Sequence, residues 1–233
     1  SLVGSEMCIR DRPQPEPSTA RAWVVTAIAL GAGSLMVAGL GLTGWGGAPL
    51  DPTALNSRLA WAPSAAAEPW RWWTAAWVHL SGLHLAANLA GLALLAALGR
   101  AGRLSGDAAL AWALAWPLTH LLLLLQPDLV AYGGLSGVLH AGVACAGVSL
   151  LAPSGRVRGQ RFVGWAVLGV LALKILSEAP GSGAVVRSVP GWDVPVAPVA
   201  HACGALAGLL ASAVVWAVRA WTRRRRTASV RAE

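Results

Sequence analysis

The chain turns from a loop into an apolar helix at residues 132–140, which read Tyr-Gly-Gly-Leu-Ser-Gly-Val-Leu-His. Gly133 and Gly134 allow the unusual backbone dihedrals of a loop that dips into the interior of a protein. Ser136 follows at the predicted start of the helix, where serine is also a common capping residue. The stretch alone is therefore compatible with a serine that caps the helix and with a serine that is catalytic. The segments around it have to decide between these two roles.

The composition places this helix in a membrane. Of the 233 residues, 56% are hydrophobic and 12% are charged, whereas a soluble domain carries about 25% charged residues. Since a span needs about 20 apolar residues, we predict an all-α membrane protein with a six-transmembrane-helix bundle. The predicted spans are Trp23–Leu42, Thr74–Leu98, Ala108–Leu125, Ser136–Leu151, Phe162–Ser177 and Val196–Ala220. The fourth and fifth are short, which neighbouring helices can compensate by burying their ends.

The basic residues orient the predicted bundle. The net charge is +8, and 14 of the 18 Lys and Arg lie in the two tails and in the loops after the second and fourth spans. The positive-inside rule places both termini in the cytoplasm. The loops ahead of Ser136 and His201 then face outward, so both side chains enter the bilayer from one side. Because the charge follows this membrane pattern, we expect the lipid bilayer and no nucleic acid as a partner.

The chain divides into one membrane domain and two tails. Residues 1–22 are polar and proline-rich and predict a disordered tail, whose residues 1–12 bear no relation to the remainder of the chain. Residues 23–220 form the membrane domain, and residues 221–233 form a basic cytoplasmic tail. The cysteines show no metal-binding spacing, and a disulfide between Cys145 and Cys203 is one open possibility.

Few polar side chains fall inside the apolar segments, and each is costly there and therefore a candidate for function. They are His79, His84, Asn88, His120, Ser136, His140 and His201. The ten acidic residues all lie in tails, loops or segment ends. We therefore predict a Ser-His dyad, with Asp193 as the one acid considered for a third member.

Ser136 and His201 have the chemistry of a nucleophile and its base. A serine hydroxyl is a weak nucleophile until a base takes its proton, which a neutral imidazole does near neutral pH. A tetrahedral intermediate also needs hydrogen-bond donors. The Ser136 N–H at a helix N-terminus, together with His84 and Asn88 on one face of the second span, would supply them. We expect Ser136 Oγ within about 3.5 Å of a His201 ring nitrogen.

Small residues would let the two helices approach. Gly204 and Gly208 are four residues apart after His201, and Gly137 and Ala141 have the same spacing after Ser136. Each feature also has an ordinary explanation, because glycine pairs serve helix packing and a single buried histidine often serves only as a hydrogen bonder. The combination, in separate helices that open to one side, favours a common site.

From Trp70-Arg71 to Ala211 these motifs resemble the rhomboid family of intramembrane serine proteases. The resemblance implies that Ser136 of Gly-Leu-Ser-Gly is the nucleophile and that His201 is the base. It implies that His84 and Asn88, as His-x3-Asn, stabilise the oxyanion. By the same resemblance, Trp70-Arg71 is structural and His79 is supportive, and no metal or cofactor takes part.

The motif Gly-Leu-Ser-Gly-Val-Leu-His and the compact plan are similar to the rhombosortase branch of that family. This similarity implies cleavage of transmembrane or C-terminally anchored protein substrates, namely exported proteins with a C-terminal Gly-Gly motif, a helix and a basic tail. The place would be the outer face of a bacterial inner membrane. His140 stands where many bacterial rhomboids have an aromatic residue, and either packing on His201 or a structural hydrogen bond is open. The alternative function is an inactive relative that binds membrane proteins for trafficking or degradation.

Overall fold

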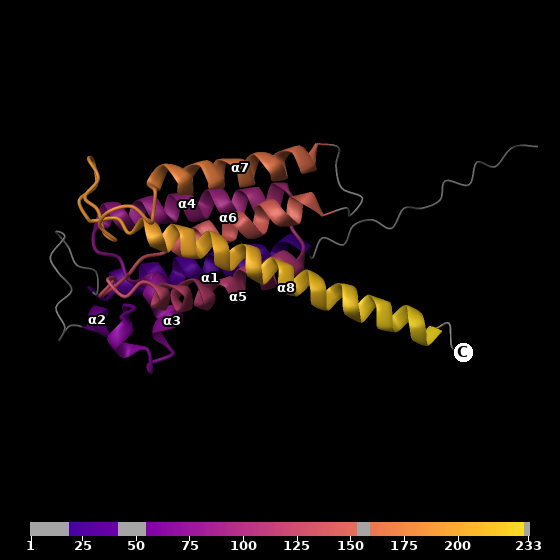
Figure 1. Cartoon of the computed structure of the whole chain (residues 1–233), viewed down its shortest axis with the longest axis horizontal. Coiled ribbons are helices and arrows are strands. Elements are labelled where there is room, and N and C mark those ends of the chain that lie inside the picture. The colour runs from indigo at the N-terminus through magenta and orange to yellow at the C-terminus, as the bar shows by residue number, and fades with distance from the viewer. Residues whose placement is uncertain (1–18, 42–54, 153–158, 231–233) are drawn as a thin grey trace, which may run out of the picture.

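A computed structural model describes residues 19–41, 55–152 and 159–230, and these form a bundle of helices (Figure 1). The long helices are α1 (Thr19–Gly39), α4 (Gly82–Ala101), α5 (Gly106–Leu122), α6 (Ser136–Leu151), α7 (Gln160–Glu178) and α8 (Pro198–Val230). The short ones are α2 (Leu55–Leu59), α3 (Arg71–Thr74) and the 3₁₀ turns Pro63–Ala65, Ala75–Trp77 and Leu123–Leu125. Within the described ranges there is no β-strand, only two isolated bridges.

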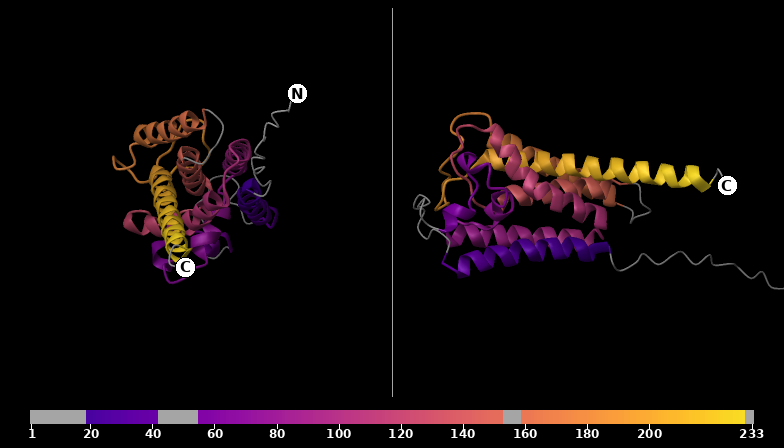
Figure 2. Two further views of the ribbon diagram at one scale, coloured as in Figure 1. Left: turned by 90° about the vertical axis from the view of Figure 1, so that its right-hand side faces the viewer. Right: turned by 90° about the horizontal axis from the view of Figure 1, so that it is seen from below.

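The bundle has the dimensions and composition of a membrane domain. Five of its helices are long and apolar enough to cross a bilayer, and α6 is a shorter apolar helix of 16 residues. The beginning of α1 and the end of α8 lie at the same end of the bundle (Figure 2). The prediction of an all-α helical membrane bundle is therefore confirmed.

The predicted boundaries hold better in the second half of the chain than in the first. The fourth span was predicted as Ser136–Leu151, and α6 has those bounds. The second span was predicted to start at Thr74, but α4 starts at Gly82 because Ser81 caps it and accepts from the His84 N–H. The residues between are a 3₁₀ turn and an extended segment that contains His79, so this histidine is not inside a span.

The two predicted tails are partly helical. Helix α1 already begins at Thr19, so residues 19–22 of the predicted disordered tail belong to it, while residues 1–18 lie outside the described residues. Helix α8 continues past Ala220 to Val230, so the described part of the basic tail prolongs the last span. Its distal turns extend beyond the other helices (Figure 1).

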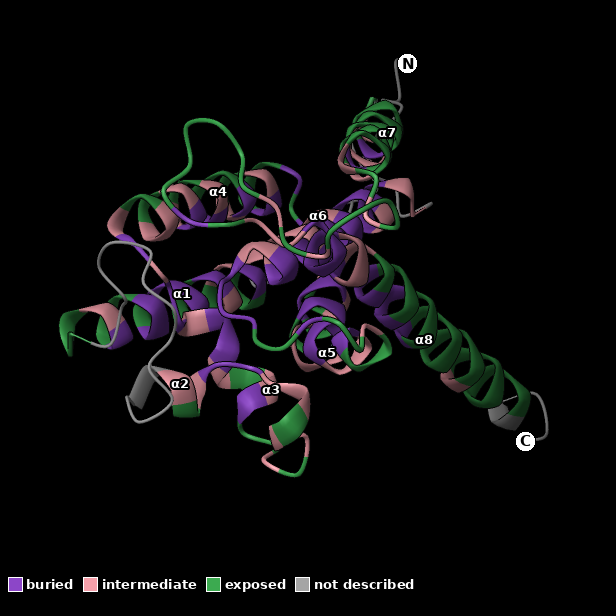
Figure 3. Cartoon of the chain, turned by 60° about the vertical axis from the view of Figure 1, so that its left-hand side comes forward, coloured by how far each residue is buried: buried purple, intermediate pink, exposed green. Residues whose placement is uncertain are grey.

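The core lies between α1, α4, α5, α6 and α8, where buried residues gather on the facing sides (Figure 3). Trp23 and Trp112 are fully buried with their rings 4.5 Å apart. Their indole N–H groups donate to backbone carbonyls, Trp112 to that of Val138 at 2.9 Å. This bond ties α5 to the residue after Gly137, close to the start of α6, and so helps to fix where Ser136 lies.

The helices α6 and α8 pack backbone to backbone. A Cβ atom on Gly204 would lie 1.9 Å from the Gly137 carbonyl oxygen, and one on Gly208 would lie 2.4 Å from that of Ala141. A Cβ on Gly137 would in turn lie 2.9 Å from the carbonyl oxygen of Ala200. Only glycine permits this approach, which brings the first turns of the two helices together.

The loop region between α2 and α4 is held by a buried arginine. Arg71 is 9% exposed, forms an ion pair with Glu68 and donates from Nη1 to the carbonyls of Ser57 and Ala60. In the same loop region, an antiparallel bridge joins Trp61 to Tyr132 by hydrogen bonds of 2.8 and 2.9 Å. The loop therefore anchors the segment that leads into α6.

Candidate active site

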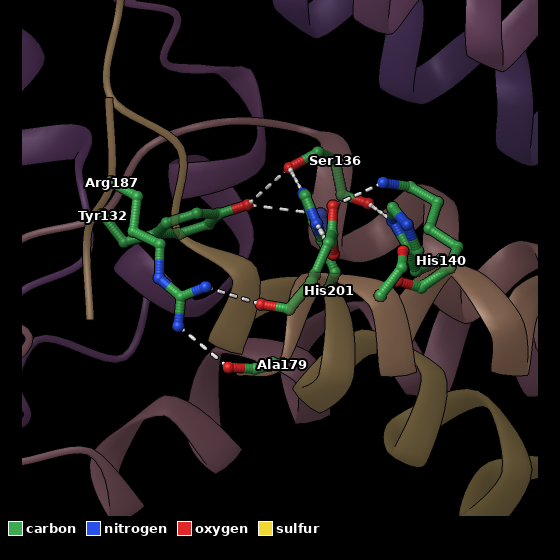
Figure 4. Close-up of polar contacts among 10 residues, drawn as sticks. Tyr132, Ser136, His140, Ala179, Arg187 and His201 are labelled. Atoms are coloured by element: carbon green, nitrogen blue, oxygen red, sulfur yellow. Dashed lines mark hydrogen bonds and ion pairs between the residues drawn. The ribbon is translucent and has the colours of Figure 1, made fainter. Parts of the chain in front are cut away.

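Ser136 occupies the first position of α6, and its hydroxyl is not used to cap the helix. The capping position is Leu135, and its side chain makes no capping hydrogen bond. The Ser136 Oγ lies 3.1 Å from His201 Nε2, with Tyr132 on its other side (Figure 4). This distance meets the expected limit of about 3.5 Å. The capping role that the sequence left open is thus not the one that this serine has in the fold.

His201 lies in the first turn of α8, which begins at Pro198. Its side chain is 8% exposed, and its two ring nitrogens face different partners. Nε2 faces Ser136, whereas Nδ1 lies 2.7 Å from Glu178 Oε2 at the end of α7. The sequence predicted a Ser-His dyad and considered only Asp193 as a third member, but the structure places Glu178, the last residue of α7, against His201.

Asp193, the acid considered from the sequence, lies elsewhere. Its Oδ1 accepts a hydrogen bond of 2.7 Å from the hydroxyl of Ser81, which is the cap of α4. The loop between α7 and α8 is in this way fastened to the N-terminal end of α4. Asp193 is therefore a loop contact and not a partner of His201.

His140 makes both of the contacts that the sequence left open. Its ring stacks on that of His201 with centroids 4.2 Å apart and planes 13° from parallel. Its Nδ1 lies 2.7 Å from the carbonyl oxygen of Ser136, one turn earlier in α6 (Figure 4). With Nδ1 as the donor, the hydrogen bond fixes the ring orientation that the stack requires. His140 thus supports the face of His201 without touching the Ser136 hydroxyl.

His84 lies against the loop that leads to Ser136. A Cβ on Gly134 would be 2.8 Å from His84 Cε1, and Gly134 has a φ of +140°, so this position requires glycine for two reasons. Asn88 lies one turn further along α4 and is 5% exposed. Its Nδ2 has no hydrogen-bond partner among the described residues. A buried amide donor without an acceptor is costly in a fold, and such sites often serve function.

Two further histidines have structural contacts. His79 Nδ1 lies 3.1 Å from the Trp77 carbonyl, and its ring meets that of His84 edge to face. Burial, and then the neighbouring His84, lower the pKa of His79 to about 4, so its imidazole is neutral. His120 lies fully buried in α5 with Nδ1 at the Trp72 carbonyl. Neither contacts Ser136 or His201 by hydrogen bond, and both instead hold the region between α2 and α4.

Tyr132 is the chain's single tyrosine, and it was not among the residues selected from the sequence. Its hydroxyl accepts from the Gly137 N–H at 3.2 Å and lies 3.2 Å from Ser136 Oγ. Burial raises the pKa of the Tyr132 phenol, which therefore stays neutral and keeps its proton for a hydrogen bond. The sequence feature that could have identified Tyr132 was its position four residues before Ser136, at the end of a loop.

The other candidates from the sequence form no site. Cys145 and Cys203 are both free, so the disulfide considered between them is not formed. In the part of the chain that the structure describes, no group of three or more His, Cys, Asp or Glu residues is placed to hold a metal ion. The polar side chains that do converge are those around the Ser136 hydroxyl.

Comparison with known proteins identifies the domain. A family model described as the Rhomboid domain matches residues 66–218, which is more than half of the chain and includes every residue of the candidate site. No curated protein matches this sequence.

Proposed function

Because the chain belongs to the rhomboid family, we propose that it is an intramembrane serine endopeptidase with Ser136 as nucleophile and His201 as base. The observation that carries the proposal is the 3.1 Å contact between Ser136 Oγ and His201 Nε2. A relative without catalytic function would not need this pair. The proposal also accounts for a serine hydroxyl that no helix cap employs.

The reaction follows from the two contacts. As Ser136 Oγ attacks the scissile carbonyl, its proton passes to His201 Nε2, and the imidazolium then gives that proton to the leaving amine. The acyl group stays on Ser136 until water, deprotonated by the same nitrogen, releases it. The Tyr132 hydroxyl, 3.2 Å from Oγ, orients the nucleophile through a hydrogen bond.

Donors for the oxyanion come from α4 and from the start of α6. His84 lies against Gly134, and the unpaired Nδ2 of Asn88 lies one turn further along the same helix face. The amide of Ser136 stands at the positive end of the α6 dipole. Donors held in place in this way stabilise charge as it develops, without a reorganisation cost during the reaction.

The substrate class follows from the resemblance to rhombosortases. We expect exported proteins anchored by a C-terminal Gly-Gly motif, a helix and a basic tail, cleaved at the outer face of a bacterial inner membrane. Peptide carbonyls in a helix are engaged in hydrogen bonds, so the segment has to unwind before Ser136 can attack. Glycine near the cut favours this unwinding because it is a poor helix former.

The test uses purified protein in detergent and a fluorophosphonate, which reacts with activated serines. We expect the parent to be labelled and Ser136→Ala not to be labelled. In cells, the parent should shorten a reporter protein that ends in Gly-Gly, a transmembrane helix and a basic tail, as measured by mass spectrometry of its C-terminus. Ser136→Ala should leave the reporter intact at equal membrane abundance.

Ser64→Ala is the matched control, because Ser64 is an exposed serine of the outer segment and should label as the parent does. Labelling of Ser136→Ala at the parent's rate would reject the nucleophile assignment. A parent protein that neither reacts with the probe nor cleaves the reporter would instead indicate a binding protein without protease activity.

A further inference from the structure

Glu178 is the one acidic side chain that the described structure places against the proposed base. Its Oε2 lies 2.7 Å from His201 Nδ1, which is the ring nitrogen that faces away from Ser136. The Glu178 side chain is 19% exposed and that of His201 is 8% exposed, so water screens the pair only in part. The separation is that of a charge-assisted hydrogen bond.

The carboxylate is held from two sides. Lys174, one turn earlier on α7, forms an ion pair with Oε1 and leaves Oε2 for His201. Arg187, from the loop after α7, donates to the backbone carbonyls of Glu178 and Ala179, each at 2.8 Å (Figure 4). This arginine satisfies the end of the helix, where carbonyls lack partners within the helix itself. Glu178 is therefore fixed in both side chain and backbone.

We propose that Glu178 is a positioning residue that completes a Ser136–His201–Glu178 triad. This inference rests on the proposed function and adds a member to its machinery. The carboxylate accepts the Nδ1–H of His201, so the lone pair of Nε2 points at the Ser136 hydroxyl. It also stabilises the imidazolium that forms when the serine proton is taken.

The surroundings of His201 make this carboxylate important. His140 from α6 stacks on the ring, His84 from α4 lies near enough to interact with it electrostatically, and neither brings a negative charge. From α7, Lys174 approaches through its ion pair with Glu178 and adds a positive charge. Asp193, the other acid of the outer loop, is bonded to Ser81. Glu178 is thus the group that offsets a positive charge on His201.

The test compares the rate of fluorophosphonate labelling across pH for the parent, Glu178→Gln and Glu178→Asp. We expect Glu178→Gln to label about 10- to 100-fold more slowly, less than for a fully buried triad carboxylate because Glu178 is partly exposed. The acid limb of its pH profile should move to lower pH, because the imidazolium loses the carboxylate that stabilises it. Glu178→Asp retains the charge and should keep the parent's acid limb with a smaller loss of rate.

Asp107→Asn is the matched control, since it also breaks an ion pair, with Arg219, but at the opposite end of the bundle. It should label as the parent does. A Glu178→Gln protein with the parent's rate and pH profile would overturn the triad while leaving the protease assignment intact. If Ser136→Ala also labels, the protease assignment itself fails, and the two failures are thereby distinguished.

A second measurement needs no variant of Glu178 and covers the case in which that variant does not fold. In an NMR spectrum of the parent labelled with ¹⁵N-histidine, the His201 signal is the one that is lost in His201→Asn. This signal should show the neutral tautomer with the proton on Nδ1. A His201 ring with its proton on Nε2 would contradict the proposal.

Discussion

Helix α7 contributes Glu178 and helix α8 contributes His201 to the site, yet the two helices are held in the bundle in different ways. In the most apolar stretch of α8, 61% of the residues are buried, whereas in the most apolar stretch of α7 only 11% are buried. Helix α8 meets α6 through glycines. Most of the α7 ribbon, in contrast, is coloured as exposed in Figure 3. Phe162, Trp165 and Leu176 are each more than half exposed.

The difference separates two tasks within one site. In the proposed mechanism Ser136 and His201 have to keep a contact of 3.1 Å, and they lie on two helices whose backbones meet at glycines. Glu178 would act only through His201, and it lies on the helix that is exposed along most of its length. Accordingly, changes at the α6–α8 contact should reduce stability and activity together, whereas changes on α7 should affect activity more than stability.

The largest effect is expected for Gly204→Ala. The added Cβ would lie 1.9 Å from the Gly137 carbonyl oxygen, so the two backbones have to separate next to the nucleophile. We expect a loss of about 3 kcal/mol in stability, at the upper end for overpacking, and no measurable labelling of Ser136. Thermal unfolding in detergent and fluorophosphonate labelling measure the two quantities.

Gly169→Ala provides the control, because Gly169 is also a helical glycine but has no neighbouring atom within 4 Å of the added Cβ. It should match the parent in both measurements. If Gly204→Ala were as stable and as reactive as Gly169→Ala, the close α6–α8 contact would not be what aligns the site.

The sequence predicted the α6–α8 side of the site better than the α7 side. Ser136 and His201 carry local signals, namely glycines at fixed spacing and polar groups inside apolar runs, and α6 has the predicted bounds. Glu178 ends a span, where an acidic residue is ordinary. Only the path of the following loop places His201, at the start of α8, against its carboxylate. The start of α4 was placed eight residues early because residues 74–81 are mostly apolar but form short turns before Ser81 caps the helix.

A smaller effect is expected for Gly164→Ala, at the contact of α7 with α6. The added Cβ would lie 2.9 Å from Leu151 Cδ2 and 3.0 Å from the Gly147 carbonyl oxygen. The leucine side chain can move, so we expect a loss of about 1 kcal/mol in stability. The labelling rate should also fall, because a shift of α7 moves Glu178 away from His201. A melting temperature lowered as far as that of Gly204→Ala would show that α7 is not the looser helix.

The smallest effect is expected at His140, whose two contacts can be separated by substitution. His140→Phe keeps an aromatic ring against His201 but loses the hydrogen bond to the Ser136 carbonyl, whereas His140→Ala loses both. An aromatic pair contributes about 0.5–1.5 kcal/mol, so His140→Ala should label about 3- to 10-fold more slowly, with His140→Phe between it and the parent. Because the ring acts by packing and carries no negative charge, neither variant should move the acid limb of the pH profile as Glu178→Gln does. Equal rates for the two variants would mean that the hydrogen bond, and not the stack, is what His140 contributes.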